Sequence, residues 1–130
     1  MKGVYILVLN VNKTKIRVGS LGEITFKGRY AYVGSAQNNL EKRIKRHLSD
    51  DKKWRWHIDY LLALANVEMV FVKSAKKSEE CATAKQLEML YEPVIGFGSS
   101  DCKCKSHLFK IPNLQDFIAV VRDLGFDFYV

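Results

Sequence analysis

Residues 32–47 place a tyrosine, an arginine and a histidine close together along the chain, and these side chains together suit chemistry on a phosphodiester. Tyr32 stands just before Gly34, where a strand would end and the chain would turn. Arg43 and His47 are four residues apart, so a helix presents them one turn apart on the same face. Phosphodiester hydrolysis requires a base for the attacking water, a cation against the developing charge and usually a metal ion. The spacing predicts that the three side chains converge at one site.

Apolar and alternating segments predict the strands that would carry such a site. The expected strands are residues 3–10, 14–18, 24–26, 30–34, 67–72 and 106–111. Gly19 and Gly22 supply turn residues between the early strands. The first 34 residues are therefore expected to form a small, mostly antiparallel sheet.

Four helices are expected to flank this sheet. Asn38 caps the first, with Glu41 three residues later in a capping-box relation, and Leu40 and Ile44 lie on its apolar face. Ser78 is expected to cap the third helix. The second, third and fourth helices are expected at residues 54–65, 78–91 and 114–124. The predicted fold class is α+β, a small mostly antiparallel sheet flanked by helices, in a single domain of 130 residues.

Positive charge is concentrated in one segment. The chain has 21 Lys and Arg against 14 Asp and Glu, and residues 41–57 hold seven basic and three acidic side chains. Such a concentration is the expected footprint of contacts to the phosphates of nucleic acid, although a solvated surface would also explain it. The residues expected to bind nucleic acid are Lys42, Arg46, Lys52, Lys53 and Arg55.

The composition is that of a globular protein, with 48% hydrophobic and 27% charged residues. No stretch approaches the roughly 20 apolar residues that a membrane span needs. Asn10, Asn12 and Lys13 interrupt the first apolar run, which is also too short for a signal peptide. We expect a cytoplasmic protein whose partner is nucleic acid, DNA before RNA, and not a membrane.

The order of the motifs resembles the GIY-YIG nuclease superfamily. Gly3-Val4-Tyr5 is similar to the first motif of that superfamily, and Tyr32-Val33-Gly34 is similar to the second. The residues that follow at the superfamily's spacing are Ser35, Leu40, Arg43 and His47. More closely, the chain resembles an archaeal and bacterial branch, formerly catalogued as a domain of unknown function and sometimes joined to an endonuclease III-type glycosylase. The segments that carry this closer resemblance are residues 28–36, 56–61 and 96–102.

The resemblance implies a role for each site residue. Tyr5 or Tyr32 would be the general base or would position water. Arg43 would hold the scissile phosphate, and His47 would assist proton transfer or position the base. Glu80 would hold one divalent ion, Mg²⁺ or Mn²⁺, which polarises the phosphoryl oxygen and the leaving group.

The chain also departs from the superfamily pattern. The spacer between the tyrosine motifs is long, which is consistent with a hairpin inserted at residues 14–27. The third helix offers Glu79, Glu80 and Glu88, and Glu80 is selected because the sequence around it resembles the branch. An acidic residue in a first helical turn is also explained by the helix dipole alone. The asparagine that follows a proline in bacterial members is missing after Pro93.

Three cysteines and one histidine could hold zinc. The odd number of cysteines predicts no disulfide framework. Cys102, Cys104 and His107 lie within six residues, and Cys81 on the preceding helix could complete a tetrahedral site. The alternative is that these cysteines are small buried hydrophobes.

Two acids and two tryptophans complete the candidates. Asp59 stands in an otherwise apolar helix and is expected to have a buried or active-site partner, and Asp101 is expected to cap loop amides. Trp54 and Trp56 could stack on bases, or could anchor the second helix in the core.

Three functions follow from these patterns. The first is a metal-dependent endonuclease that hydrolyses DNA phosphodiesters, associated with repair or recombination. The second is a non-catalytic nucleic-acid-binding module of the same fold, and the third is a zinc-stapled interaction domain. Cleavage, salt-dependent binding and stoichiometric zinc distinguish them.

Overall fold

A computed structural model describes residues 1–98 and 103–130, and within them six strands form one antiparallel sheet in the order β4-β5-β2-β1-β3-β6. The strands are β1 (Gly3–Arg17), β2 (Glu23–Ala36), β3 (Ala65–Lys73), β4 (Glu92–Pro93), β5 (Leu108–Lys110) and β6 (Asp127–Phe128). The helices are α1 (Leu40–Leu48), α2 (His57–Leu62), α3 (Ser78–Glu88) and α4 (Leu114–Asp123), with a 3-10 turn at Gly19–Leu21. The structure is the predicted α+β arrangement.

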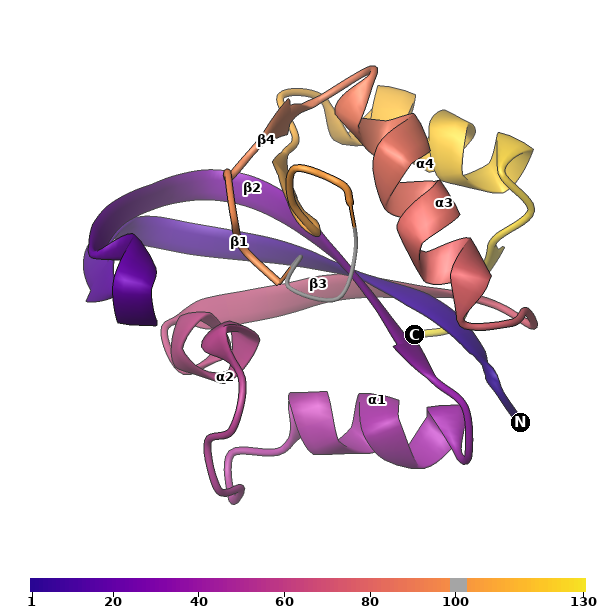
Figure 1. Cartoon of the computed structure of the whole chain (residues 1–130), viewed down its shortest axis with the longest axis horizontal. Helices are drawn as coiled ribbons and strands as arrows, with labels where there is room; N and C mark the ends of the chain where they lie inside the picture. The colour runs from indigo at the N-terminus through magenta and orange to yellow at the C-terminus, as the bar shows by residue number, and fades with distance from the viewer. Residues whose placement is uncertain (99–102) are drawn as a thin grey trace.

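The sheet is the middle layer of three (Figure 1). Side chains alternate along β1, because successive residues of a strand point to opposite faces. Leu7 and Leu9 pack with residues of α1 and α2, whereas Ile6 and Val8 pack with residues of α3 and α4. Both faces are covered, which explains why β1 begins as a continuous apolar run rather than an alternating one.

The first two strands are longer than predicted. β1 and β2 pair in register from Gly3 opposite Ala36 to Arg17 opposite Glu23, with one irregularity between Val11 and Thr14. The hairpin expected at residues 14–27 is present, with Thr14 opposite Phe26 and Arg17 opposite Glu23, and it forms the far end of the two long strands. The polar residues that suggested a break occupy the irregular part of the ladder.

Two helix starts and one helix length were predicted wrongly. Asn39, not Asn38, caps α1 by accepting a hydrogen bond from the Lys42 amide at 2.9 Å. The position before α3 is Lys77, so Ser78 is the first helical residue and not its cap. α2 covers His57–Leu62 instead of residues 54–65, because the chain is extended at Trp56 and β3 already begins at Ala65.

The last helix follows the prediction closely. Asn113 accepts a hydrogen bond from the Asp116 amide at 3.0 Å, and α4 ends two residues before Gly125. No helix in the part of the chain that the structure describes has the length and apolar character needed to cross a membrane.

Candidate active site

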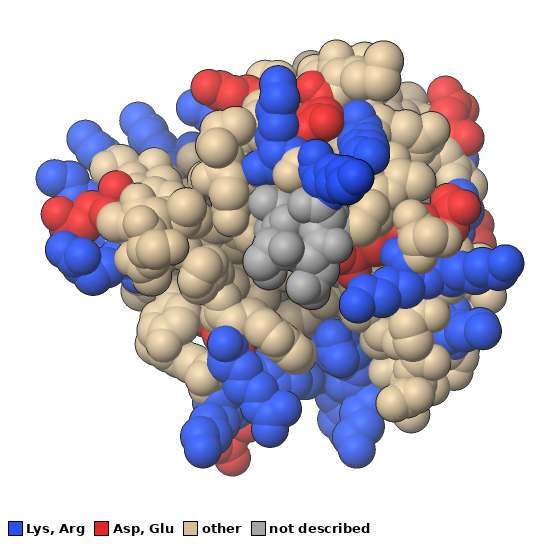
Figure 2. Space-filling view, viewed as in Figure 1, with Lys and Arg blue, Asp and Glu red and all other residues tan. Residues whose placement is uncertain are grey.

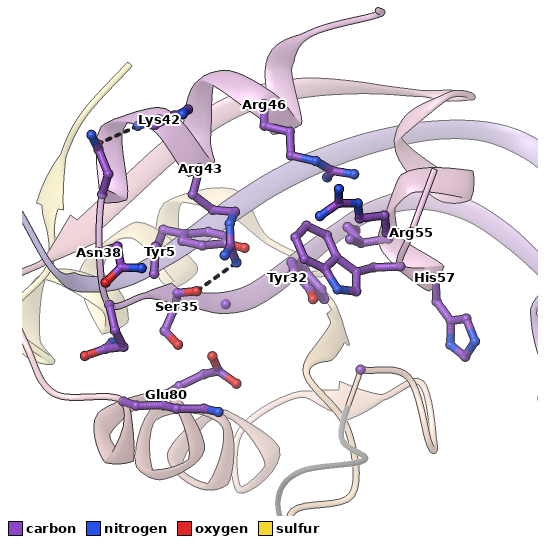
Figure 3. A pocket seen from close by; sticks show the side chains of 18 residues that line it. Tyr5, Tyr32, Ser35, Asn38, Lys42, Arg43, Arg46, Arg55, His57 and Glu80 are labelled. Atoms are coloured by element: carbon purple, nitrogen blue, oxygen red, sulfur yellow. Dashed lines mark hydrogen bonds between the residues drawn. The ribbon is translucent and has the colours of Figure 1, made fainter. Parts of the chain in front are cut away.

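A cavity of about 1000 Å³ opens where β1, β2, α1, α2 and α3 meet. Four of the five predicted catalytic residues line it: Tyr5, Tyr32, Arg43 and Glu80. In Figure 3 Arg43 descends from α1 toward Ser35, and Glu80 faces them from α3 on the opposite side. The fifth residue, His47, does not line this cavity but lies behind Tyr5. The fold thus joins helices from both sides of the sheet in one site.

The glycines of the two tyrosine motifs make room for the site. Gly34 is opposite Tyr5 in the β1–β2 ladder. A Cβ atom at Gly34 would contact the phenol oxygen and ring of Tyr5. A Cβ atom at Gly3 would collide with the backbone oxygen of Lys73. The motif spacing therefore has a packing reason: the second glycine forms the floor on which the first tyrosine lies.

Tyr5 is paired with a buried histidine. Its hydroxyl lies 2.7 Å from Nε2 of His47, and His47 is only 3% exposed. Nδ1 of His47 is buried and has no hydrogen-bond partner among the described residues. Burial lowers the pKa of His47 to about 3, so the imidazole is neutral at physiological pH.

Both phenols keep their protons at neutral pH. Burial raises the pKa of Tyr5 well above its ordinary value, and Tyr32 adds to the shift while Arg43 opposes it. Burial also raises the pKa of Tyr32, with Glu80 as the next cause. A phenol here can act as a base only if its own proton leaves at the same time, and the neutral His47 beside Tyr5 can accept it.

Arg43 is oriented from two sides. Its Nη1 donates a hydrogen bond to the backbone oxygen of Ser35 at 3.2 Å. Its guanidinium carbon lies 4.8 Å from the ring centroid of Trp56, a cation–π contact. Trp56 thereby holds the Arg43 guanidinium in place, and it also lines the cavity.

Arg46 has a structural partner. Both of its terminal nitrogens donate to the carboxylate of Asp59, at 2.9 and 3.0 Å, and Asp59 is fully buried. Burial would raise the pKa of Asp59, but hydrogen bonds from Arg46 and from the amides of Arg55 and Trp56 outweigh it and lower that pKa to about 2. Asp59 was expected to have a buried or an active-site partner; its partner Arg46 is half-buried and lines the cavity, and the charge of Arg46 is largely balanced.

The other predicted cations are distributed unevenly. Lys42 and Arg55 line the cavity, together with Lys77, which the sequence did not single out. Lys52 donates to the backbone oxygen of His47 at 2.9 Å and lines a second, smaller cavity, and Lys53 is exposed. Figure 2 shows Lys and Arg side chains gathered over the region of α1 and the segment that leads to α2.

Of the three glutamates on α3, Glu80 is the one that lines the cavity. Glu79 lies 4.0 Å from Lys73, and Glu88 accepts a hydrogen bond from the Lys105 amide at 3.1 Å. Burial would raise the pKa of Glu80, but hydrogen bonds from His107 and Ser35 outweigh it, so that pKa is lowered. Glu80 is therefore a carboxylate at neutral pH.

The predicted zinc ligands are partly brought together. Ligand atoms of Glu80, Cys81 and His107 lie within 4.8 Å of one another, and Cys104 Sγ lies 3.1 Å from His107 Nε2. Cys81 is disulfide-bonded, which the odd cysteine count did not predict, so its sulfur is not a free thiolate. Cys102 and Asp101 lie outside the described residues.

Among the described residues that line the cavity, Glu80 is the one that could hold a divalent ion through a carboxylate. Mg²⁺ is commonly held by one or two carboxylates together with waters and substrate phosphates. Glu80 offers one ionised carboxylate to a cavity that is open and otherwise rich in cations and hydroxyls.

Comparison with known proteins places the chain in one family. The family described as a domain of unknown function, DUF123, matches residues 4–128, and the chain belongs to it. Neither a curated protein nor a solved structure matched the chain.

Proposed function

We propose that this member of the DUF123 family is a metal-dependent endonuclease of the GIY-YIG type, which hydrolyses phosphodiester bonds in DNA in repair or recombination. One observation carries the proposal: Tyr5, Tyr32, Arg43 and Glu80 line one cavity, in the same order along the chain as the motifs that resemble that superfamily. Phenol, guanidinium and carboxylate are the groups that such a hydrolysis requires.

Tyr5 and His47 supply the base. Water that attacks the phosphorus gives a proton to the Tyr5 oxygen, and the phenol proton passes to Nε2 of His47 at 2.7 Å. The imidazole is neutral and has a lone pair for this proton, but burial lowers its pKa to about 3 and so opposes the transfer. A phosphodiester in the cavity adds negative charge nearby, which favours the imidazolium that forms.

Arg43 stabilises the charge that develops on the phosphoryl oxygens. Its contacts with Ser35 and Trp56 fix the guanidinium before substrate arrives, so little reorganisation is needed during reaction. Glu80 would hold a divalent ion, which when bound supplies a Lewis acid for the phosphoryl oxygen and the leaving group. Tyr32, on the opposite side of the cavity floor, would position the attacking water.

The basic rim favours a polyanionic substrate. Lys42, Arg55 and Lys77 surround the cavity, and among the described residues that line it Glu80 is the one acid. Charges of one sign in a cleft concentrate and orient a ligand of the opposite sign. Nucleic acid satisfies this requirement and also provides the scissile phosphodiester.

The direct test is cleavage by the purified full chain. The protein is incubated with Mg²⁺ or Mn²⁺ and with branched, nicked and single-stranded DNA, with RNA of the same sequence as a second series. Glu80→Gln should lower the cleavage rate by about 100-fold or more, since it removes the carboxylate. Glu79→Gln, one residue away and directed at Lys73, is the matched control and should cleave at the wild-type rate. Unchanged cleavage in Tyr32→Phe, Arg43→Ala and Glu80→Gln together would refute the mechanism.

The non-catalytic binding module is the second candidate, and the high pKa values of both phenols favour it. It predicts binding to DNA that weakens steeply with salt and no cleavage with any metal ion. The zinc-stapled domain requires Cys81 as a thiolate, so it predicts stoichiometric zinc only in protein purified under reducing conditions.

A further inference from the structure

A second buried histidine lies behind Glu80 on the α3 side of the cavity. His107 is 2% exposed, and its Nδ1 lies 3.2 Å from a carboxylate oxygen of Glu80. On the other side of the ring, Nε2 lies 3.1 Å from the sulfur of Cys104, which is a free and buried cysteine. Cys104, His107 and Glu80 thus form a continuous chain of contacts that ends at the cavity.

The backbone holds this imidazole firmly. The His107 amide donates to the oxygen of Phe97 at 2.8 Å, and its carbonyl accepts from the Val33 amide at 2.9 Å. The Ser106 hydroxyl accepts a hydrogen bond from the Leu108 amide at 2.9 Å. Because Val33 lies in the second tyrosine motif, the backbone of His107 is fixed to the same strand that carries Tyr32.

The two partners of the His107 ring determine which of its nitrogens carries the hydrogen. A carboxylate can only accept hydrogen bonds, so Nδ1 of His107 carries the hydrogen that points to Glu80. Nε2 can then accept from the thiol of Cys104. Metal-binding carboxylates are commonly held by hydrogen bonds from outer groups, and these groups tune the affinity of the metal.

We propose that His107 is a positioning residue which holds the Glu80 carboxylate in the orientation that binds a divalent ion, with Cys104 fixing the imidazole from behind. This inference rests on the proposed function, because it assigns Glu80 a metal. The geometry does not make Cys104 a nucleophile: the thiol is 7% exposed, and neither Cys104 nor His107 lines the cavity. The histidine acts through Glu80 and does not touch the substrate.

The test measures Mn²⁺ binding to the full chain by electron paramagnetic resonance, without substrate. His107→Leu keeps the bulk of the ring but removes the donor, and it should weaken Mn²⁺ binding by about 10- to 100-fold. His107→Asn places an amide donor near the position of Nδ1 and should restore most of the affinity. Glu80→Gln defines the signal that belongs to this site.

A second readout separates positioning from general structural damage. In cleavage assays His107→Leu should lower kcat and raise the Mn²⁺ concentration needed for half-maximal rate, with KM for DNA unchanged, because the basic rim is intact. A variant with wild-type Mn²⁺ affinity and wild-type metal dependence overturns the proposal. If His107→Leu does not fold, Cys104→Ala carries the test: it leaves the imidazole in place and should weaken Mn²⁺ binding several-fold.

Failure of this proposal differs from failure of the proposed function. If the wild-type chain binds Mn²⁺ through Glu80 and His107→Leu weakens that binding, the positioning role stands even when no DNA is cleaved. If the chain cleaves DNA and His107→Leu behaves as wild type, the endonuclease stands and the positioning role is wrong. A wild-type chain that binds no Mn²⁺ overturns the positioning role.

Discussion

The cavity has two walls: the α1 wall is formed by α1 and the segment that leads to α2, and the α3 wall is formed by α3. Each wall has a buried histidine behind a site residue, but the groups around the two histidines differ. His47, on the α1 wall, contacts the neutral phenol of Tyr5; the charged groups near it are the Asp59 carboxylate and the three cations Arg46, Lys52 and Arg43. His107, on the α3 wall, lies between the carboxylate of Glu80 and a thiol. In the proposed mechanism the same type of side chain therefore has two roles, proton acceptor at His47 and hydrogen-bond donor at His107.

The walls also differ in what holds them. The α1 wall depends on the ion pair between the half-buried Arg46 and the buried Asp59, and on the stacking of Arg43 and Arg46 on Trp56. The α3 wall depends on the backbone hydrogen bonds of His107. Loss of one charge should therefore damage the α1 wall, whereas the α3 wall should tolerate changes that keep a donor.

The largest effect is expected on the function of the α1 wall. Arg43→Ala removes the guanidinium that faces the phosphate, and loss of one such stabilising group lowers kcat by about 100- to 1000-fold. Arg43→Lys should recover little of it, because an ammonium cannot donate as a fork to both Ser35 and a phosphate. Single-turnover cleavage of DNA measures both.

Lys45→Ala, an exposed change on the same helix, is the control for Arg43 and should cleave at the wild-type rate. Full recovery of cleavage in Arg43→Lys would show that only the charge matters. The contacts of Arg43 with Ser35 and Trp56 would then not be needed for cleavage.

The next effect concerns the stability of the same wall. Asp59→Asn leaves Arg46 without its buried carboxylate and should lower the free energy of unfolding by about 3 kcal/mol, since breaking a buried pair on one side is costly. Urea unfolding measures it. Asp51→Asn, an exposed change nearby, should stay within about 0.5 kcal/mol of wild type.

The dependence of the free energy of unfolding on pH in the acid range gives a further check on Asp59. Its pKa is lowered from 3.8 to about 2 in the folded chain, so the ion pair contributes fully above pH 3.8 and loses its contribution as the pH falls toward 2. Asp59→Asn should lack that part of the acid transition. An unchanged transition in the variant would show that the pair does not hold the wall.

The sequence allowed the α1 wall to be predicted better than the α3 wall, for a physical reason. Arg43 lies on the helix just after Gly34, so local spacing predicted its place at the cavity, whereas His47 on the same helix lies behind Tyr5 and not in the cavity lining. His107 reaches Glu80 only because β5 pairs with β2, a contact between residues far apart in the chain. The sequence therefore presented His107 as a zinc ligand beside Cys104, and its contact with Glu80 was not foreseen.

The strand lengths show the same limit. The irregularity between Val11 and Thr14 interrupts the apolar pattern, and the residues around it were interpreted as a break between strands. Pairing with β2, which is almost as long, carries the ladder through this interruption, and periodicity along a single strand contains no information about its partner. Lys77 was missed because nothing local distinguishes it from other surface lysines near α3.

The third prediction tests whether His47 is neutral in the folded chain, through the pH dependence of stability. Burial gives His47 a pKa of about 3 in the folded chain against 6.5 for an exposed histidine, so between these values the unfolded chain binds a proton that the folded chain does not. The free energy of unfolding should therefore fall as the pH drops below 6.5, by about 2 kcal/mol between pH 7 and pH 5. Urea unfolding of wild type and His47→Gln at both pH values measures it.

His47→Gln removes the titrating group and keeps a polar atom near Tyr5, so this variant should lose that part of the pH dependence. The same pH dependence in wild type and variant would mean that His47 is not neutral in the fold. The Tyr5–His47 pair would then lose its role as proton acceptor.

The smallest effect is expected at the rim of the α1 wall. Lys42 is exposed and lines the cavity, so Lys42→Ala should weaken DNA binding only a few-fold at moderate salt. It should also lower the slope of log affinity against log salt by about 1, because one phosphate contact fewer releases one counterion fewer. Lys15→Ala, an exposed lysine on β1 outside the cavity lining, should leave the slope unchanged. If both variants lower the slope equally, DNA binds to general surface charge, and the α1 wall has no special part in holding it.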